Sequence, residues 1–274
     1  MTRQFVILVS AAFVLMGRVG LAGTLWLGND TGGPVFHTGT DGTLLGSVVT
    51  PVTGIAFDGS SLYFSNSIGG TTRRTLDGAT VLNGFSAPPF GSPTEDLAWD
   101  STRNRLWRID HASPFLVRIN PVTGLVDQTV ALSTTDPAGL LTPLGGLGIA
   151  YDPIRDLLYA SFCQQGCASF GTGLIMSFSP VTGASAGLEL RPGFATGGLA
   201  FDPLTDTLWV GANQVIHNIA LDGSDLSSFT KPGGAGFTDG LEFVPSVPEP
   251  VTSGLLLSAV LFLVFRDRTT IGKG

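Results

Sequence analysis

Lysine is almost missing from this sequence, because only Lys231 and Lys273 occur among its 274 residues. Charged residues of all kinds make up 13% of the chain, and the formal net charge is -7. Nucleic-acid-binding proteins need a basic patch to neutralise phosphates, and the sequence offers none, so nucleic acid is not an expected partner. The low charge and the 38 glycines also argue against a helical bundle and against charge-rich disorder.

The motifs of several enzyme classes are missing too. The sequence has no G-x-S-x-G, no H-E-x-x-H and no phosphate-binding loop. Its three histidines, His37, His111 and His217, lie far apart in the chain. These absences favour a non-catalytic protein, and they leave open enzyme classes that carry no such motif.

Cysteine occurs twice, as Cys163 and Cys167 in "SFCQQGCASF". In an oxidising compartment, an even pair this close together is typical of one small disulfide loop. A zinc site would need further ligands, and the histidines are remote in sequence. We therefore predict a Cys163–Cys167 disulfide, with two free thiols or a metal or redox role as the alternatives.

Long apolar runs are found only at the two ends. At the start, Arg3 is followed by an apolar run over residues 5–16 and by the small residues Gly20 and Ala22. This order matches the three regions of a secretory signal peptide, which we predict over residues 1–22, as a helix. The alternative is an uncleaved anchor, although the run is short for a membrane span.

The other apolar run covers residues 251–265 and ends at two arginines. As a helix it would be about 23 Å long, shorter than a hydrocarbon core of about 30 Å. Two prolines hold the backbone before it extended and outside the helix, where an enzyme can reach it. The segment's candidate sorting residues are Val247, Pro248, Glu249, Pro250, Arg266 and Arg268.

Together, the Pro-Glu-Pro motif, the apolar run and the basic residues of positions 247–274 resemble the PEP-CTERM sorting signal of Gram-negative bacteria. The resemblance implies recognition by an exosortase, cleavage near the Pro-Glu-Pro, transient anchoring in the inner membrane, and delivery to the cell surface or extracellular matrix. The tail "RDRTTIGKG" is longer and less basic than is usual for the family. A plain single-span anchor is the alternative.

Four similar units lie between the two ends. They are "GIAFDGSSLYFSNS" from residue 54, "DLAWDSTRNRLWRID" from 96, "GIAYDPIRDLLYASF" from 148 and "GLAFDPLTDTLWVGA" from 198. Each reads as a strand, an Asp-containing turn and a second strand, and is followed by a second hairpin with an Asp-Gly or Thr-Gly turn. The units recur every 42 to 52 residues. Four strands at this period are typical of a β-propeller blade.

The two ends of the repeat region complete a fifth blade. The segment "TLWLGND" from Thr24 matches the second strand of a unit, and "DGLEFVP" from Asp239 matches the missing innermost strand. We predict an all-β, five-bladed propeller over residues 23–246, closed by pairing of residues 25–29 with 241–244. An open repeat array or a β-sandwich is the alternative.

Units such as "GLAFDP…LWV" resemble the NHL-type, quinoprotein and gluconolactonase-like propellers, a likeness that is generic to repeats and names no activity. In gluconolactonase-like propellers, acidic and Asn side chains hold a divalent metal at the mouth, the rim where inner strands begin. Hard oxygen ligands of this kind suit Ca²⁺, although no cofactor is required by the sequence. The candidate ligands here are Glu95, Asp239, Asn66, Asp110 and Asn213. His111 would be an adjacent base.

Structural roles explain other repeated residues. Aspartates recur at the first turn of each unit, where a carboxylate caps backbone N–H groups: Asp58, Asp100, Asp152 and Asp202. Aromatic residues recur at one strand position, where we predict packing between blades: Trp26, Tyr63, Trp107, Tyr159 and Trp209.

The leading hypothesis is therefore an exported propeller that acts as a non-catalytic binding or structural module at the cell surface or in the matrix. An exopolysaccharide-rich setting suggests a glycan or matrix partner, bound by the loops at 133–147 and 163–174. The alternative is a metal-dependent hydrolase of the gluconolactonase type, with its site at the propeller mouth.

Overall fold

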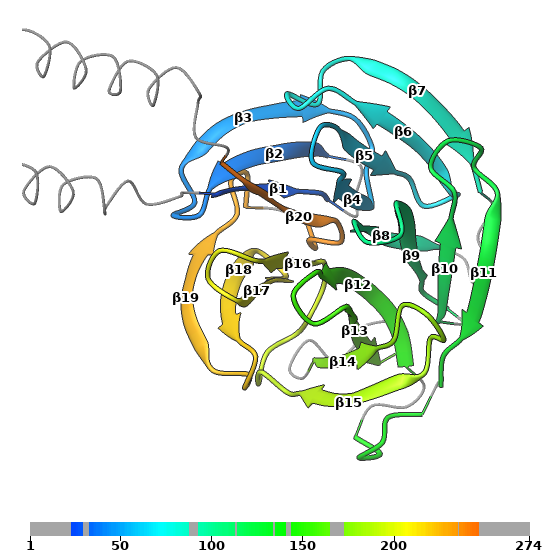
Figure 1. Cartoon of the computed structure of the whole chain (residues 1–274). Helices are drawn as coiled ribbons and strands as arrows, with labels where there is room; N and C mark the ends of the chain where they lie inside the picture. Colours follow the sequence, from blue (N-terminus) through cyan, green and yellow to red (C-terminus); the bar gives the residue numbers. More distant parts are fainter. Residues whose placement is uncertain are drawn as a thin grey trace, which may run out of the picture. The chain divides into compact units, whose positions relative to one another are not determined.

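The computed structural model describes residues 23–29, 33–87, 93–112, 114–133, 135–140, 144–164, 173–234 and 236–246. These residues form twenty strands in five four-stranded antiparallel sheets, the blades of a ring (Figure 1). The predicted five-bladed, all-β propeller is confirmed. The signal helix and the C-terminal apolar helix fall outside the described residues. Within the described ranges, no helix is long and apolar enough for a membrane span.

Each blade is given from its innermost to its outermost strand. Blade 1 contains β20 (Leu241–Pro245), β1 (Gly23–Leu27), β2 (Pro34–Gly39) and β3 (Leu44–Val49). Blade 2 contains β4 (Gly54–Phe57), β5 (Leu62–Ser65), β6 (Gly70–Arg74) and β7 (Val81–Ser86). Blade 3 contains β8 (Thr94–Asp100), β9 (Arg105–Asp110), β10 (Phe115–Ile119) and β11 (Val126–Ala131). Blade 4 contains β12 (Leu144–Asp152), β13 (Leu157–Gln164), β14 (Leu174–Phe178) and β15 (Ser185–Leu190). Blade 5 contains β16 (Leu199–Asp202), β17 (Thr207–Ala212), β18 (Val215–Ala220) and β19 (Asp225–Thr230).

The ring closes in blade 1, where strands from both ends of the repeat region pair. Strand β20 is hydrogen-bonded to β1, and the amide of Gly28 donates to the carbonyl of Gly240 over 2.7 Å. Each inner strand keeps one edge toward the axis, and closing the ring leaves these edges short and protected. The pairing predicted from the two incomplete repeats is therefore present.

Hydrophobic packing is divided into five clusters, and each cluster joins two neighbouring blades. The cluster of Leu25, Leu27, Leu241 and Phe243 with Trp209 joins blade 5 to blade 1. The five repeated aromatic residues are all buried, with exposed fractions between 0% for Trp107 and 4% for Trp209. The predicted packing role of these aromatic residues is confirmed.

The turn between the inner and second strands also repeats as predicted. The carboxylate of Asp152 accepts the amides of Ile154 and Arg155 over 2.7 and 3.0 Å, and Asp58 accepts those of Ser60 and Ser61 over 2.8 and 2.7 Å. Asp100 and Asp202 make the same kind of cap. The aspartates that recur in the sequence are therefore turn caps.

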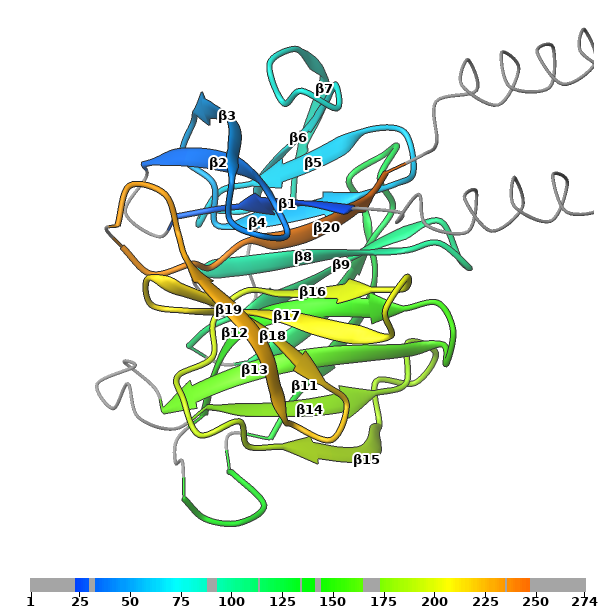
Figure 2. The ribbon, with the colours of Figure 1, turned by 90° about the vertical axis from the view of Figure 1, so that its left-hand side faces the viewer.

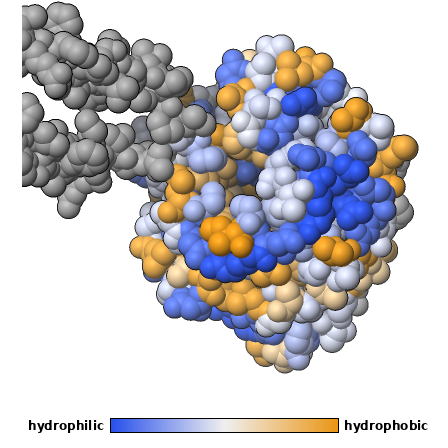
Figure 3. Space-filling view, viewed as in Figure 1, coloured by the Kyte–Doolittle hydropathy of each residue, from blue (hydrophilic) through white to orange (hydrophobic). Residues whose placement is uncertain are grey.

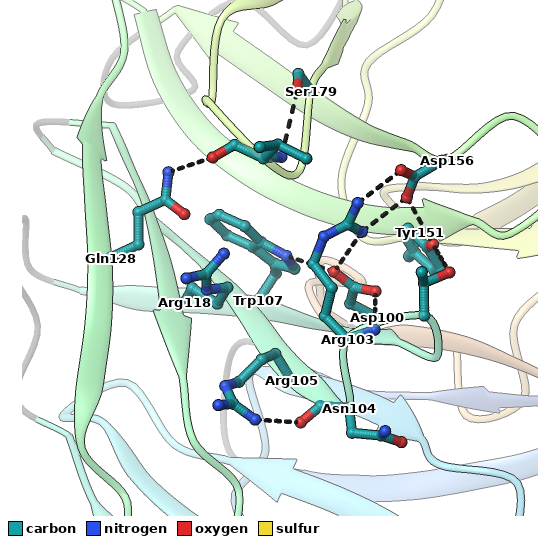
Figure 4. A network of polar contacts seen from close by, with 12 residues as sticks. Asp100, Arg103, Asn104, Arg105, Trp107, Arg118, Gln128, Tyr151, Asp156 and Ser179 are labelled. Carbon is teal, nitrogen blue, oxygen red and sulfur yellow. Dashed lines mark hydrogen bonds and ion pairs between the residues drawn. The ribbon is translucent and has the colours of Figure 1, made fainter.

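Arginine side chains connect these turns from one blade to the next (Figure 4). Arg103 contacts Asp100 of its own turn over 3.0 Å and Asp156 of blade 4 over 2.6 Å. Arg155 repeats the arrangement with Asp152, over 2.9 Å, and with Asp206 of blade 5, over 2.6 Å. We call the rim that carries these turns the turn face. Figure 3, which looks onto this face, shows broad hydrophilic areas with smaller hydrophobic patches between them.

Candidate ligand pocket at the propeller mouth

The mouth lies at the opposite rim, where the inner strands begin. In the side view of Figure 2 the inner strands run from left to right, so the mouth is on the left. A cavity of about 1000 Å³ opens there, which is at the upper end of the roughly 300–1,000 Å³ of small-molecule sites. Its polar lining consists of Glu95, His111, Asn213, Gln214, His217 and Asp239.

These side chains come from positions where the blades differ from one another. Glu95 is near the start of β8, and Asp239 lies two residues before β20, after a glycine-rich connection. His111 follows the last residue of β9, and Asn213 occupies a turn between β17 and β18 with φ 53°. An asparagine tolerates this left-handed conformation better than most residues. The polar lining therefore comes from blades 1, 3 and 5, and Leu147 of β12 adds an apolar side chain from blade 4.

Two carboxylates are buried in the pocket lining. Glu95 is 6% exposed and Asp239 is 2% exposed. The Nδ1 atom of His111 lies 3.7 Å from Oε1 of Glu95 and 3.0 Å from the carbonyl oxygen of Gly146. No arginine or lysine occurs among the described residues that line the cavity. The side chains of the lining therefore favour a cationic or neutral ligand over an anionic one.

The other histidine is held in place on two sides. Nδ1 of His217 is 2.9 Å from Oδ2 of Asp225, and its ring stacks on Phe194 with centroids 3.8 Å apart. Phe194 and Phe237 supply the aromatic part of the lining. The hydrogen bond and the stacked ring together fix the orientation of the His217 imidazole in this wall of the pocket.

A buried lysine supports the wall from behind. Lys231 is 1% exposed, and its ammonium donates to the carbonyl oxygens of Gly236 and Phe237 over 3.1 and 3.4 Å. The residue thereby fixes the connection that carries Phe237 and Asp239. The sequence analysis did not predict this structural role of Lys231. The rarity of lysine in the chain was the one feature that singled this residue out.

The five predicted metal ligands do not come together. Glu95, Asp239 and Asn213 line the mouth cavity, but Asp110 is buried and pairs with Arg108 over 2.8 Å. Asn66 caps a turn by accepting the amides of Ile68 and Gly70 over 3.2 and 2.9 Å. Three of the five predicted ligands therefore line the cavity, and the other two are not among its lining residues. Among the described residues, no three His, Cys, Asp or Glu side chains are grouped to hold a metal ion.

The axis of the ring contains a carboxylate that sequence reasoning also missed. Asp96 is fully buried. Its two oxygens accept backbone amides from the inner strands of four blades: Ile55 at 3.3 Å, Leu97 at 2.8 Å, Ile149 at 3.3 Å and Leu199 at 3.1 Å. Burial raises the pKa of the Asp96 carboxyl well above its usual range, and the amide donors act in the opposite direction.

The sequence did carry a signal for this residue. Asp96 stands at the repeat position that is glycine in the other four blades, Gly54, Gly148, Gly198 and Gly240. A Cβ at Gly54 would lie 2.7 Å from the carbonyl oxygen of Glu95, and Cβ atoms at Gly148 and Gly198 would also meet backbone of the next inner strand. The inner strands are therefore too close for side chains at these positions, and one carboxylate fills the axial space.

For the predicted disulfide and the predicted sorting motif, the described residues include only Cys163. Cys163 is buried, at 5% exposed, but Cys167 lies outside the described residues, so the disulfide stays a prediction. The sorting residues Val247, Pro248, Glu249, Pro250, Arg266 and Arg268 lie outside them as well.

No family model and no curated protein matches this sequence. The fold is similar to a solved structure of a nidogen/laminin complex, with 13% identity and a TM-score of 0.53 over 82% of this chain and 100% of that chain. It is also similar to a protein of unknown function from Bacteroides caccae, with 11% identity and a TM-score of 0.51 over 82% and 100% of the two chains. At these identities the likeness shows the propeller fold alone.

Proposed function

We propose that this protein is an exported ligand-binding propeller that is sorted to the cell surface or extracellular matrix. The observation that carries the binding role is the mouth cavity of about 1000 Å³, with two buried carboxylates and two positioned histidines in its lining. Ligand sites of this kind combine an apolar wall with a few convergent polar groups. One solved structure of the same fold belongs to a nidogen/laminin complex, which is a setting of protein binding.

Binding is favoured over catalysis by the composition of the lining. The described lining contains no serine, threonine, cysteine or lysine that would act as a nucleophile. His111 and Glu95 are neighbours, but the described residues bring no metal-binding group of three acidic, His or Cys side chains beside them. Hydrolysis of the gluconolactonase type therefore has no support.

Binding is tested with the full chain, purified in detergent and applied to an array of surface glycans. We expect a restricted set of glycans to bind, and we expect Phe237→Ala to weaken that binding because it removes an aromatic wall of the cavity. Leu226→Ala is the matched control, because Leu226 is 56% exposed on the outer strand β19, away from the mouth. Equal loss in both variants would exclude the mouth as the glycan-binding site, and an empty array would exclude these glycans as the ligand.

Export and sorting rest on the sequence of the two ends. The test is mass spectrometry of the mature protein from the native envelope, with and without the exosortase. We expect a new N-terminus near residue 23 in both strains. We expect a C-terminus near the Pro248–Pro250 motif only in the strain that has the exosortase. An intact residue 274 in both strains would instead favour a permanent anchor.

A further inference from the structure

Among the described residues, those that line the mouth cavity include acidic side chains and no arginine or lysine. The described lining contains the carboxylates of Glu95 and Asp239 and no arginine or lysine. Both carboxylates are more than nine-tenths buried, at 6% and 2% exposed. In such a partly desolvated place, attraction between a carboxylate and a cation is stronger than in bulk water.

Two buried cationic side chains of the described residues, Lys231 and Arg108, are not part of the lining. The ammonium of Lys231 donates to carbonyl oxygens of Gly236 and Phe237, and the guanidinium of Arg108 pairs with Asp110 over 2.8 Å. Neither side chain lines the cavity. The electrostatic character of the lining is thus set by acidic and neutral side chains.

Aromatic surface lies on the same lining. Phe194 and Phe237 both line the cavity, and His217 stacks on Phe194. The face of an aromatic ring attracts an ammonium group and also packs against the C–H surface of a ring or chain. A ligand that combines a cationic group with a carbon skeleton therefore matches both parts of the lining.

We propose that the mouth pocket selects ligands that carry an organic ammonium group, with that group at Glu95 and Asp239 and the carbon skeleton against Phe194 and Phe237. This inference rests on the proposed binding function and narrows its ligand class. Two sources supply this chemistry: a glycan with free amino groups, and a small aliphatic amine. The cavity of about 1000 Å³ accommodates either one.

Isothermal titration of the full chain with three probes separates these cases at about pH 6, where both alkyl amines and most amino-sugar amines carry a proton. The probes are a glucosamine disaccharide, its N-acetylated form and the diamine cadaverine. We expect the glucosamine disaccharide to bind at least about tenfold more tightly than the N-acetylated form, since acetylation removes the charge. Cadaverine binding equal to that of the disaccharide would assign the selectivity to the amine alone, in support of the proposal.

Substitutions locate the binding to the carboxylates. Glu95→Gln and Asp239→Asn should each weaken binding of the glucosamine disaccharide about tenfold or more, with thermal unfolding as a check on folding. Glu189→Gln is the matched control, because Glu189 pairs with Arg191 on the outer strand β15. If Asp239→Asn does not fold, Glu95→Gln decides the question.

Two results would overturn the inference. Equal affinity for the N-acetylated and free-amine probes, with both lost in Phe237→Ala, would remove the ammonium selectivity and leave the binding pocket standing. No binding of any of the three probes, together with an empty glycan array, would remove both proposals.

Discussion

The turn face and the mouth of this propeller differ in how far their residues repeat from blade to blade. On the turn face, neighbouring blades repeat one solution: an aspartate caps the turn, and an arginine reaches the acidic residue of the next blade, as Arg103 does with Asp156 (Figure 4). At the mouth, corresponding positions carry different residues, such as Glu95 in blade 3 and Asp239 in blade 1. Repetition thus marks residues that hold blades together, and variation around the mouth marks the candidate site.

One residue departs from the repeat and still serves packing. Asp96 replaces a glycine of the other blades and accepts amides from four inner strands. Variation alone therefore does not identify a functional residue. Its surroundings decide: Asp96 is enclosed by backbone amides, while Glu95 and Asp239 line an open cavity.

The largest expected loss of stability is that of a variant at Asp96. Asp96→Ala would leave several buried amides without an acceptor, each at a cost of about 1–3 kcal/mol, so we expect a loss of at least about 4 kcal/mol or failure to fold. Thermal unfolding followed by circular dichroism measures it. Asp222→Ala is the control, because Asp222 caps an exposed turn with Ser224. Similar small losses in both variants would mean that Asp96 does not join the blades.

A smaller effect is expected where a hairpin glycine contacts the preceding blade. Gly124 has φ 71°, and a Cβ there would lie 2.7 Å from Cβ of Phe85 in blade 2. Gly139 has φ 70° with open space around it. Both alanine variants carry similar backbone strain, about 1–3 kcal/mol for such conformations. We expect Gly124→Ala to lose about 1–3 kcal/mol more than Gly139→Ala in urea unfolding, because only it also overpacks a blade interface.

The pH dependence of stability gives a third test. Because burial raises the pKa of Asp96 in the folded state, its contribution to stability is fully present below its unfolded pKa of about 4 and is lost as pH rises through the raised folded value. The free energy of unfolding of the natural protein should therefore fall relative to Asp96→Asn as pH increases from about 4 to 8. A constant difference across that range would show that the carboxyl keeps an ordinary pKa.

The smallest effect is expected on the turn face itself. The side chains of Arg155 and Asp206 are 36% and 48% exposed, so loss of their ion pair in Asp206→Asn, which leaves the Arg155–Asp152 pair in place, should cost less than about 1 kcal/mol. High salt should reduce the difference from the natural protein further. A loss of several kcal/mol in chemical denaturation would mean that these inter-blade contacts, rather than the buried clusters, dominate the stability of the ring.

Much of the fold was predictable from the sequence, because aligning the repeat units with one another reveals the strand and turn positions that they share. The recurring Asp turns, the aromatic position of Trp107 and Tyr159, and the incomplete first unit were sufficient for five blades and their closure. The candidate site was harder, because its side chains come from segments of several blades that are remote in sequence. Strand-end positions gave Glu95, Asp239 and Asn213 correctly as lining residues, but they could not show that Asp110 turns inward to Arg108.

The two missed residues were hidden for different physical reasons. Lys231 holds carbonyl oxygens of its own connection, at Gly236 and Phe237, and no known turn or cap motif marks this arrangement in the sequence. Asp96 accepts amides from remote inner strands, such as that of Leu199, and those contacts depend on the ring being closed. The sequence shows Asp96 as the one non-glycine residue at this repeat position. Its role can be recognised only once the inner strands are known to lie close together around the axis.

Hydrogen–deuterium exchange with and without the glucosamine disaccharide tests most directly whether the mouth binds while the turn face only joins blades. We predict slower exchange over residues 211–217 and 236–240, which carry Asn213, His217 and Asp239, and no change over the turns at 100–104 and 152–156. Protection confined to those turns, with the mouth segments unchanged, would contradict the assignment of the site.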